Sequence, residues 1–215
     1  RYTFPQSDES HILFDLNIPE EGQTRIVSAM VCQVSDSEIE GYVQKKLGWN
    51  EYTLHFVAQT SKPFTSFGGW TGTEITNSSK IQIKENKDIG AFVTFSTQEN
   101  EIVFLKTAIS YVSIEQARLN LKKEMDDFGW DFDAVRKSTS DAWNNLLSKI
   151  KVEGGTEKDK TKFYTNMYRA YCARTIFSDV NGKYVDMCEQ VQQLPDPSSP
   201  IYGCDAFWNT FWNLN

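Results

Sequence analysis

The residues with the clearest chemical potential lie in the last segment of the chain, 177–215. Two acidic residues, Asp186 and Glu189, precede a proline-rich loop, and an aromatic run that contains Trp208 and Asn209 follows it. Aromatic faces stack on the apolar side of a sugar ring, while carboxylates and amides hydrogen-bond to its hydroxyl groups. The pattern therefore fits a sugar-binding site, and it also fits an aromatic core beside a solvated loop.

The composition excludes two classes of partner. The chain has 29 acidic and 22 basic residues and a formal net charge of −7. It has no basic run, which argues against a nucleic-acid partner. Mean hydropathy is −0.49, and no apolar run approaches the roughly 20 residues of a membrane span. No signal-peptide pattern is present, so these residues do not indicate the cellular compartment.

Both ends of the sequence lack boundary signals. The chain starts at Arg1 without an initiator methionine, and it stops at Asn215 inside an aromatic stretch with no capping residue. We therefore expect a piece of a longer protein, whose remaining polypeptide is the first partner of this chain.

The spacing of cysteine and histidine argues against a zinc site. No C-x-x-C pair occurs, and the residues concerned are far apart in sequence: Cys32, Cys172, Cys188, Cys204, His11 and His55. Cys188 and Cys204 are close enough in sequence to form a disulfide in an oxidising compartment. Free buried thiols are the alternative that we favour.

Residues 1–112 show the period-2 alternation of β-strands. The alternating segments are 11–18, 24–34, 52–58, 81–83, 91–95 and 102–109. Short strands at this spacing with polar turns between them predict an antiparallel β-sandwich. Within the second segment, Ile26, Met30 and Cys32 are predicted to share one face. His55 falls on the polar face of its strand, where we expect a surface or partner-facing histidine.

One glycine-rich segment stands out in this half, Ser66 to Gly72. Its three glycines would allow a close approach of the backbone to a ligand. A wide hairpin is the interpretation that we favour, because glycine is common in hairpin loops. The nearby Asn77-Ser78-Ser79 is a formal glycosylation acceptor, which functions only in a secretory eukaryotic host.

At Ser113 the hydrophobic period becomes helical. Ser113 and Gln116 form a capping box, and apolar residues follow at positions 114, 117, 121 and 125. A second helix is predicted from about residue 131 or 133 to the glycine pair at 154–155. Thr156 is expected to cap a third helix, 157–174, whose wide apolar arc is typical of a helix covered on both sides.

Motifs in order along the chain carry a family resemblance: Arg1–Pro5, Ser61–Phe64, Thr107–Ser113, Trp130–Phe132, Ile150–Thr156, Phe177–Tyr184 and Phe207–Phe211. They resemble glycoside hydrolase family 92, the calcium-dependent exo-acting α-mannosidases common in Bacteroidetes. That resemblance implies a β-sandwich, linker helices and an (α/α)6 barrel. It places an incomplete sandwich at 1–112, linker helices at 113–152 and the start of a truncated barrel at 153–215.

The resemblance also implies a chemistry. Inverting glycosidases use a carboxylic acid that protonates the leaving oxygen and a carboxylate that activates water, about 6.5–9.5 Å apart. In this family a calcium ion with oxygen ligands contacts the mannose hydroxyls. The catalytic carboxylates and most calcium ligands are expected beyond residue 215. No catalytic or metal-binding residue is therefore assigned here, and this chain alone is expected to be inactive.

Trp208 and Asn209 are the substrate-binding residues that the resemblance implies. The family motif is Trp-Asp-Thr, whose Trp and Asp face the terminal mannose. Asn209 in place of Asp removes a charge, keeps one acceptor and adds two donors, which leaves altered specificity and lost activity both open. The turn from Ser178 to Gly182 is interpreted as structural, because Asp and Asn in such turns bond to their own backbone.

Three functional hypotheses follow. The first, which we predict, is part of an exo-acting α-mannosidase, α-1,2-selective, that acts on N-glycans or mannan in the periplasm or after secretion. The second is a non-catalytic carbohydrate-binding protein of the same fold, motivated by Asn209 and the segment 66–72. The third is a structural module in which the sandwich and helices only pack.

Overall fold

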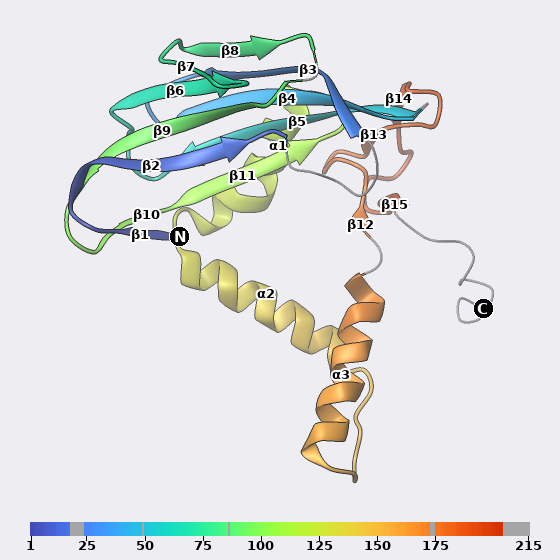
Figure 1. Cartoon of the computed structure of the whole chain (residues 1–215). Coiled ribbons are helices and arrows are strands. Elements are labelled where there is room, and N and C mark those ends of the chain that lie inside the picture. Colours follow the sequence, from blue (N-terminus) through green and yellow to red (C-terminus); the bar gives the residue numbers. More distant parts are fainter. Residues whose placement is uncertain (18–23, 49, 86, 173–174, 204–215) are drawn as a thin grey trace.

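The computed structural model describes residues 1–17, 24–48, 50–85, 87–172 and 175–203. In Figure 1 the strands stack as layers in one half of the molecule, and helix α1 packs beneath them. Helices α2 and α3 extend away from the sheets, and the short strands β12 to β15 return toward them. No helix in the described ranges is long and apolar enough to cross a membrane.

Two antiparallel sheets form the β half. The five-stranded sheet has the order β11 (Leu105–Ser110), β5 (Asn50–Thr60), β4 (Glu38–Leu47), β3 (Thr24–Gln33) and β8 (Lys80–Ile83). The four-stranded sheet has the order β2 (Ser7–Asp15), β9 (Ile89–Thr97), β6 (Ser66–Thr71) and β7 (Glu74–Thr76). A further pair joins β1 (Tyr2–Phe4) to β10 (Glu101–Val103). The predicted antiparallel sandwich is confirmed.

The hydrophobic core lies between the two sheets. Alternate residues of β9 face it, and Ile89, Val93 and Phe95 are completely buried. Val31 and Ile39 of the opposite sheet are equally inaccessible. Burying one such side chain stabilises the fold by roughly 1.5–3 kcal/mol, so this layer is the main source of stability in the β half.

A β-bulge changes the predicted faces of β3. The register between β3 and β4 shifts between Ile26 and Ser28. A bulge inserts one extra residue and so reverses which side chains face the core beyond it. As a result Ala29 and Val31 are buried with Ile26, and the expectation that Met30 and Cys32 share a face with Ile26 was wrong.

The glycine-rich segment 66–72 is a strand and not a wide hairpin loop. It forms β6, which pairs with β9 and β7, and only its last residue, Gly72, adopts positive φ, in the tight turn into β7. A Cβ atom on Gly69 would lie 2.3 Å from the carbonyl oxygen of Gly90, and one on Gly68 would lie 2.5 Å from the Phe92 ring. Close packing within the sheet therefore explains both glycines.

Helix α1 (Ile114–Met125) begins where the sequence predicts. The Ser113 side chain accepts a hydrogen bond from the backbone N–H of Gln116 at 3.2 Å. The helix packs on the five-stranded sheet, where Ala117 and Leu121 are buried against Val57. Arg118 of α1 also forms ion pairs with two residues of β4, Glu38 at 2.6 Å and Glu40 at 2.5 Å.

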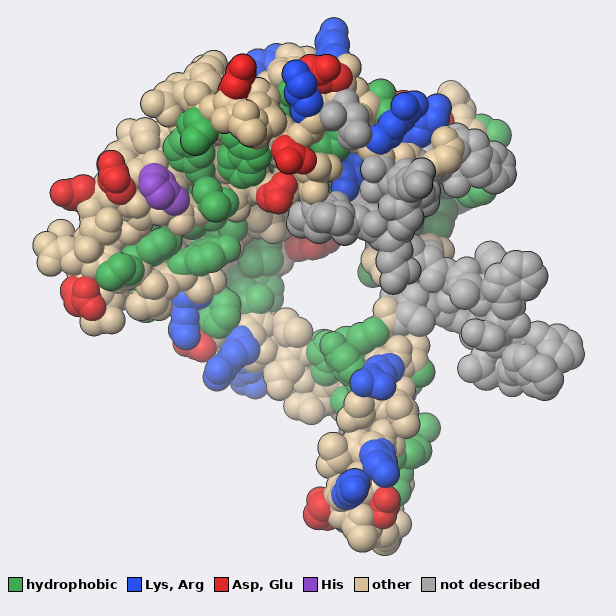
Figure 2. All heavy atoms as spheres, in the orientation of Figure 1, with side chains coloured by type: hydrophobic (Ala, Val, Ile, Leu, Met, Phe, Trp, Pro, Cys, Tyr) green, Lys and Arg blue, Asp and Glu red, His purple; other side chains and the backbone are tan. Residues whose placement is uncertain are grey.

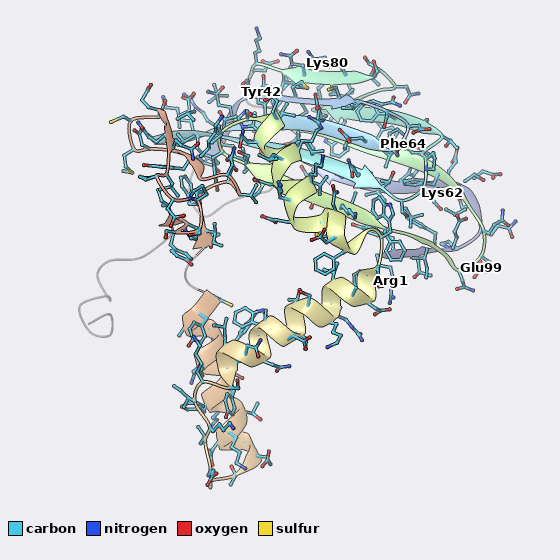
Figure 3. All side chains as sticks on the ribbon, turned by 180° about the vertical axis from the view of Figure 1, so that it is seen from behind. Arg1, Tyr42, Lys62, Phe64, Lys80 and Glu99 are labelled. Atoms are coloured by element: carbon cyan, nitrogen blue, oxygen red, sulfur yellow. The ribbon has the colours of Figure 1, made fainter. Side chains whose placement is uncertain are left out.

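Helices α2 (Phe132–Leu147) and α3 (Glu157–Cys172) follow a single 3₁₀ turn, η1 (Asp126–Phe128). The Asp131 carboxylate caps α2, and Thr156 and Asp159 bond reciprocally at the start of α3. Helix α2 ends at Leu147, earlier than the glycine pair that was predicted to end it. None of the described residues of α2 and α3 is fully buried. Figure 3 shows Arg1 near the start of α2. Its guanidinium carbon lies 5.0 Å from the centroid of the Phe132 ring.

After α3 the chain returns to the sandwich and forms two small two-stranded sheets, one of which is a hairpin. β12 (Thr175–Ile176) pairs with β15 (Tyr202–Gly203), and β13 (Lys183–Val185) pairs with β14 (Val191–Gln193). We call residues 175–203 the junction segment. In Figure 1 it lies beside α1 at one end of the five-stranded sheet.

Candidate functional site

The predicted substrate-binding residues, Trp208 and Asn209, lie outside the described residues, as does Cys204. The junction segment, which leads to them, is described. It bonds to the end of β11 and to α1, so the place where the two halves of the chain join is the candidate site. Its geometry can be built from the side chains that hold the segment there.

Asp179 is the centre of this junction. Its side chain is buried, with 7% of the residue exposed. One carboxylate oxygen, Oδ2, accepts from the Ser110 hydroxyl at 2.8 Å, and Oδ1 accepts from the Asn120 amide at 2.7 Å. Ser110 ends β11 and Asn120 lies on α1, so one carboxylate joins a strand, a helix and the junction segment.

Asn120 completes the network. Its amide nitrogen also donates to the carbonyl of Ile109 at 2.9 Å, and its carbonyl oxygen accepts from the backbone N–H of Val180 at 3.0 Å. Both amide hydrogens are therefore used, as a buried polar group requires. The Asn120 side chain thereby bonds to the strand and to the turn at the same time.

The turn from Ser178 to Gly182 differs in part from its predicted role. Asn181 does bond to its own backbone, because its side chain accepts from the N–H of Lys183 at 3.3 Å. Asp179 instead uses its carboxylate for distant partners, while its backbone closes the turn with Lys183 and Gly182 at 2.7 and 2.8 Å. Gly182 has φ +82°, which favours glycine at that position.

Aromatic stacking and backbone hydrogen bonds hold the two ends of the junction segment in place. Tyr111 follows β11 and stacks on Phe177, with 4.8 Å between ring centroids. Gly203, at the other end of the segment, pairs with Thr175 in the ladder between β12 and β15. The backbone N–H of Phe177 donates to the carbonyl of Ile201 at 2.8 Å. The last described residues are thus held against the end of the sandwich.

His55 also faces this junction. Its Nδ1 lies 3.3 Å from the Ser110 carbonyl oxygen, and its ring is 6.1 Å from that of Tyr42. The side chain is half-buried, and this burial lowers the pKa of His55. The sequence predicted a surface or partner-facing histidine; the ring is only half exposed, because β11 and α1 pack beside it.

Other carboxylates near the junction are held by different means. Burial raises the pKa of Glu124 on α1, and the negative charge of Asp179 adds to that effect. Asp186 accepts from the N–H groups of Cys188 and Gln190 and from the Gln192 amide at 2.8–2.9 Å. The bond from Gln190 is the main reason that the pKa of Asp186 is lowered. Asp186 therefore stabilises its own hairpin.

Possible calcium ligands among the described residues would be clusters of acidic side chains. Within the described ranges no group of three or more His, Cys, Asp or Glu side chains could hold a metal ion. The Asp179 carboxylate accepts from the Ser110 and Asn120 side chains, and the Asp186 carboxylate accepts only from groups of its own hairpin. The expected calcium ligands, which were predicted mostly outside this chain, stay a prediction.

A separate groove of about 490 Å³ lies between α2 and α3. Its lining is mainly apolar and comprises Leu147, Glu157, Lys160, Thr161, Tyr164, Thr165 and Tyr168. Figure 2 shows hydrophobic side chains gathered where the two helices meet. Trp143 contacts Tyr168 there, with 4.5 Å between ring centroids. The groove is open and offers no cluster of acidic groups.

Sequence reasoning missed Ser110 and Asn120. A signal for Asn120 was present, because it falls beside Ala117 and Leu121 on the stripe that α1 buries. A polar residue on an apolar helix face needs a specific partner. The sequence gives no sign that the partner is Asp179.

The described structure is thus a β-sandwich followed by helices, and a polar junction joins the two parts. Two family models match the chain: the glycosyl hydrolase family 92 N-terminal domain over residues 1–110, and the glycosyl hydrolase family 92 catalytic domain over residues 116–215. The chain belongs to glycosyl hydrolase family 92.

Solved structures share the fold. The family GH92 α-mannosidase BT3965 from Bacteroides thetaiotaomicron is 27% identical with a TM-score of 0.85, over 97% of this chain and 28% of that protein. The GH92 inverting mannosidase BT2199 from Bacteroides thetaiotaomicron VPI-5482 is 20% identical with a TM-score of 0.80, over 97% of this chain and 27% of that protein. At that identity the second likeness shows the fold alone.

A curated relative matches a shorter stretch. An uncharacterized secreted glycosidase from Arthroderma benhamiae (strain ATCC MYA-4681 / CBS 112371) is 28% identical over 85 residues, which are 38% of this chain and 11% of that protein. The chain therefore spans only a minor part of the length of each of these relatives.

Proposed function

We propose that this chain is part of a glycoside hydrolase that releases terminal α-linked mannose from glycans. The observation that carries the proposal is the ordered match of both halves to one family, at 1–110 and 116–215. A solved relative that covers 97% of this chain is described as an α-mannosidase. The packed junction supports a protein in which both matched domains act as one unit.

The finer parts of the proposal come from the family resemblance. The enzyme is exo-acting and α-1,2-selective, and its substrates are N-glycans or mannan. It inverts the anomeric centre with a general acid and a general base that lie beyond residue 215. Calcium is its cofactor, with ligands mostly outside this chain. Export to the periplasm or the medium is supported by a relative described as secreted.

Trp208 and Asn209 are the proposed contacts to the terminal sugar. An indole face packs on the apolar side of a pyranose. An asparagine amide both donates to and accepts from hydroxyl groups, whereas the aspartate of the family motif only accepts. The proposed role of Asn209 is therefore a neutral contact that holds a hydroxyl less strongly than the aspartate would.

The decisive experiment is an assay on a protein of full family length that contains this chain. We expect free mannose to be released from α-1,2-linked mannobiose, and no sugar from the β-linked isomer. Calcium chelation should lower the rate by at least about tenfold, and added calcium should restore it. No release at any calcium concentration would contradict the proposed activity.

A second candidate function is a non-catalytic carbohydrate-binding protein of the same fold. The observation in its favour is Asn209, which stands where the family motif has an acid. Glycan-array binding without release of mannose would support this alternative. Turnover of mannobiose would exclude it.

A further inference from the structure

We propose that Asp179 is a positioning residue for the sugar site, because it fixes the junction segment on the sandwich through directional hydrogen bonds. The inference rests on the proposed function, since it concerns the chain that leads to the proposed sugar contacts. The carboxylate itself is buried and acts through the residues it holds, so it is not a catalytic group.

The first argument is the range of the contacts. Ser110 is 69 residues before Asp179, and Asn120 is 59 residues before it. Ser110 is also the last residue of the N-terminal-domain match, whereas Asn120 and Asp179 belong to the catalytic-domain match. One side chain therefore bonds across the boundary between the two matched domains.

The second argument is the choice of a carboxylate. Burying a charged group is unfavourable unless it is well hydrogen-bonded. Both donors to Asp179, the Ser110 hydroxyl and the Asn120 amide, are neutral groups. Apolar packing would hold the turn without a defined orientation, because it is non-directional. Two hydrogen bonds from two different elements instead fix both the position and the orientation of the turn.

The third argument is that the turn controls the far end of the junction segment. Phe177 and Ser178 immediately precede Asp179, and both bond to Ile201: Phe177 donates to its carbonyl at 2.8 Å, and the Ser178 hydroxyl accepts from its N–H at 3.2 Å. Gly203 pairs with Thr175, which lies four residues before Asp179, in the ladder between β12 and β15. A shift of the turn is therefore passed to residues 201–203, from which the chain continues to Trp208.

The test uses the full-length protein with Asp179→Ala, Asp179→Asn and Ser110→Ala. Asp186→Ala is the matched control, because Asp186 is a carboxylate of the same segment that bonds only within its own hairpin. For each variant, kcat and KM on mannobiose are measured well below its melting temperature. Hydrogen exchange at residues 199–203 is measured in parallel.

We expect Asp179→Ala to lower kcat/KM by about ten- to a hundredfold, since a misplacement on the order of 1 Å is enough for such a loss. The control should stay within about twofold, given that its hairpin contacts leave the Asp179 bonds intact. Asp179→Asn should recover most of the loss, because its amide oxygen accepts from Asn120 and its nitrogen donates to the Ser110 hydroxyl. Ser110→Ala added to Asp179→Ala should cause little further loss.

Two outcomes would overturn the proposal. One is a folded Asp179→Ala protein that matches the control in both kcat/KM and exchange at 199–203. The other is an Asp179→Asn protein as impaired as Asp179→Ala, which would assign the effect to charge. If Asp179→Ala does not fold, Asp179→Asn and Ser110→Ala are compared with the Asp186→Ala control in kcat/KM and in exchange at 199–203 instead. A wild-type protein without mannosidase activity overturns the proposed function alone, and exchange at 199–203 still decides whether Asp179 fixes the segment.

Discussion

At the scale of single residues, buried polar side chains are bonded to partners far away in the sequence. Ser10 and Thr97 bond at 2.7 Å across the four-stranded sheet, as Asp179 does across the junction. Such pairs prevent the cost of an unsatisfied buried group. In the described part of the chain the side-chain oxygen of Gln116 is the exception, because it is buried without a hydrogen-bond partner.

His55 gives a prediction for pH. Its pKa in the folded protein lies below its ordinary value of 6.5, because burial disfavours the charged ring. The unfolded chain therefore takes up the proton first, so the free energy of unfolding should fall as pH drops below 6.5. The free energy of unfolding should stop falling once the pH is below the pKa of His55 in the folded protein. His55→Gln should remove this part of the pH dependence.

Urea unfolding over a series of pH values, with wild type and His55→Gln in parallel, checks this prediction. Glu124 acts with the opposite sign, since its raised pKa lowers stability as pH rises above its ordinary value of 4.5. That contribution is common to both proteins and cancels in their difference. Parallel stability curves for the two proteins would show that His55 has the same pKa in both states.

At the scale of elements, local signals decide where the helices begin and burial decides where they dock. A side-chain oxygen of Ser113, Asp131 or Thr156 accepts the backbone N–H three residues on. Docking of α1 depends mainly on Leu121, whose burial contributes roughly 1.5–3 kcal/mol. The partly exposed ion pairs of Arg118 contribute about 0–1 kcal/mol. Apolar burial therefore dominates, and the ion pairs select the orientation.

The N-cap of α1 provides the prediction at this scale. Ser113→Ala should lower the free energy of unfolding by about 1 kcal/mol, because the N–H of Gln116 loses its acceptor. The free energy of unfolding of Ser113→Asn should lie within about a few tenths of a kcal/mol of the wild-type value, since asparagine caps helices about as well as serine. Midpoints of urea unfolding at constant m-value provide the measurement. Equal losses in both variants would argue against a capping role.

At the scale of the whole molecule, stability is unevenly distributed. The sandwich encloses a continuous core with fully inaccessible residues such as Val93 and Phe95. By contrast, α2 and α3 contain no fully buried residue among those described. Phe163 and Tyr168 keep 37% and 45% of their surface exposed. The wide apolar arc predicted for the third helix is present, but no described residue covers it fully.

Hydrogen exchange on the 215-residue chain should reveal this difference. Amides of β3, β4, β5 and β9 should exchange slowest, with opening free energies close to that of global unfolding. Amides of α2 and α3 should exchange much faster, because few buried contacts must be broken to open them. Comparable protection in both halves would contradict this distribution and would require a further source of stability for the helices.

The sequence predicted the sandwich and the starts of the helices, because alternation and capping depend on residues a few positions apart. It did not predict the face reversal in β3, since a bulge is set by pairing with β4. His55 was predicted to lie at the surface or to face a partner, because a strand pattern does not show which elements of the same chain pack on a polar face. Of the candidate site, the sequence indicated only the turn from Ser178 to Gly182, as a structural turn, and neither the buried carboxylate of Asp179 nor its partners.

The sequence by itself thus determined that a β half is followed by a helical half and to which family the chain belongs, and it led to the prediction that Trp208 and Asn209, which lie outside the described structure, contact sugar. Tertiary structure decided that Asp179 bonds to Ser110 and Asn120. The physical reason is the range of each interaction. Periodicity and caps act within one element, whereas a bond between residues 69 positions apart exists only after the sheet, the helix and the returning turn have packed together.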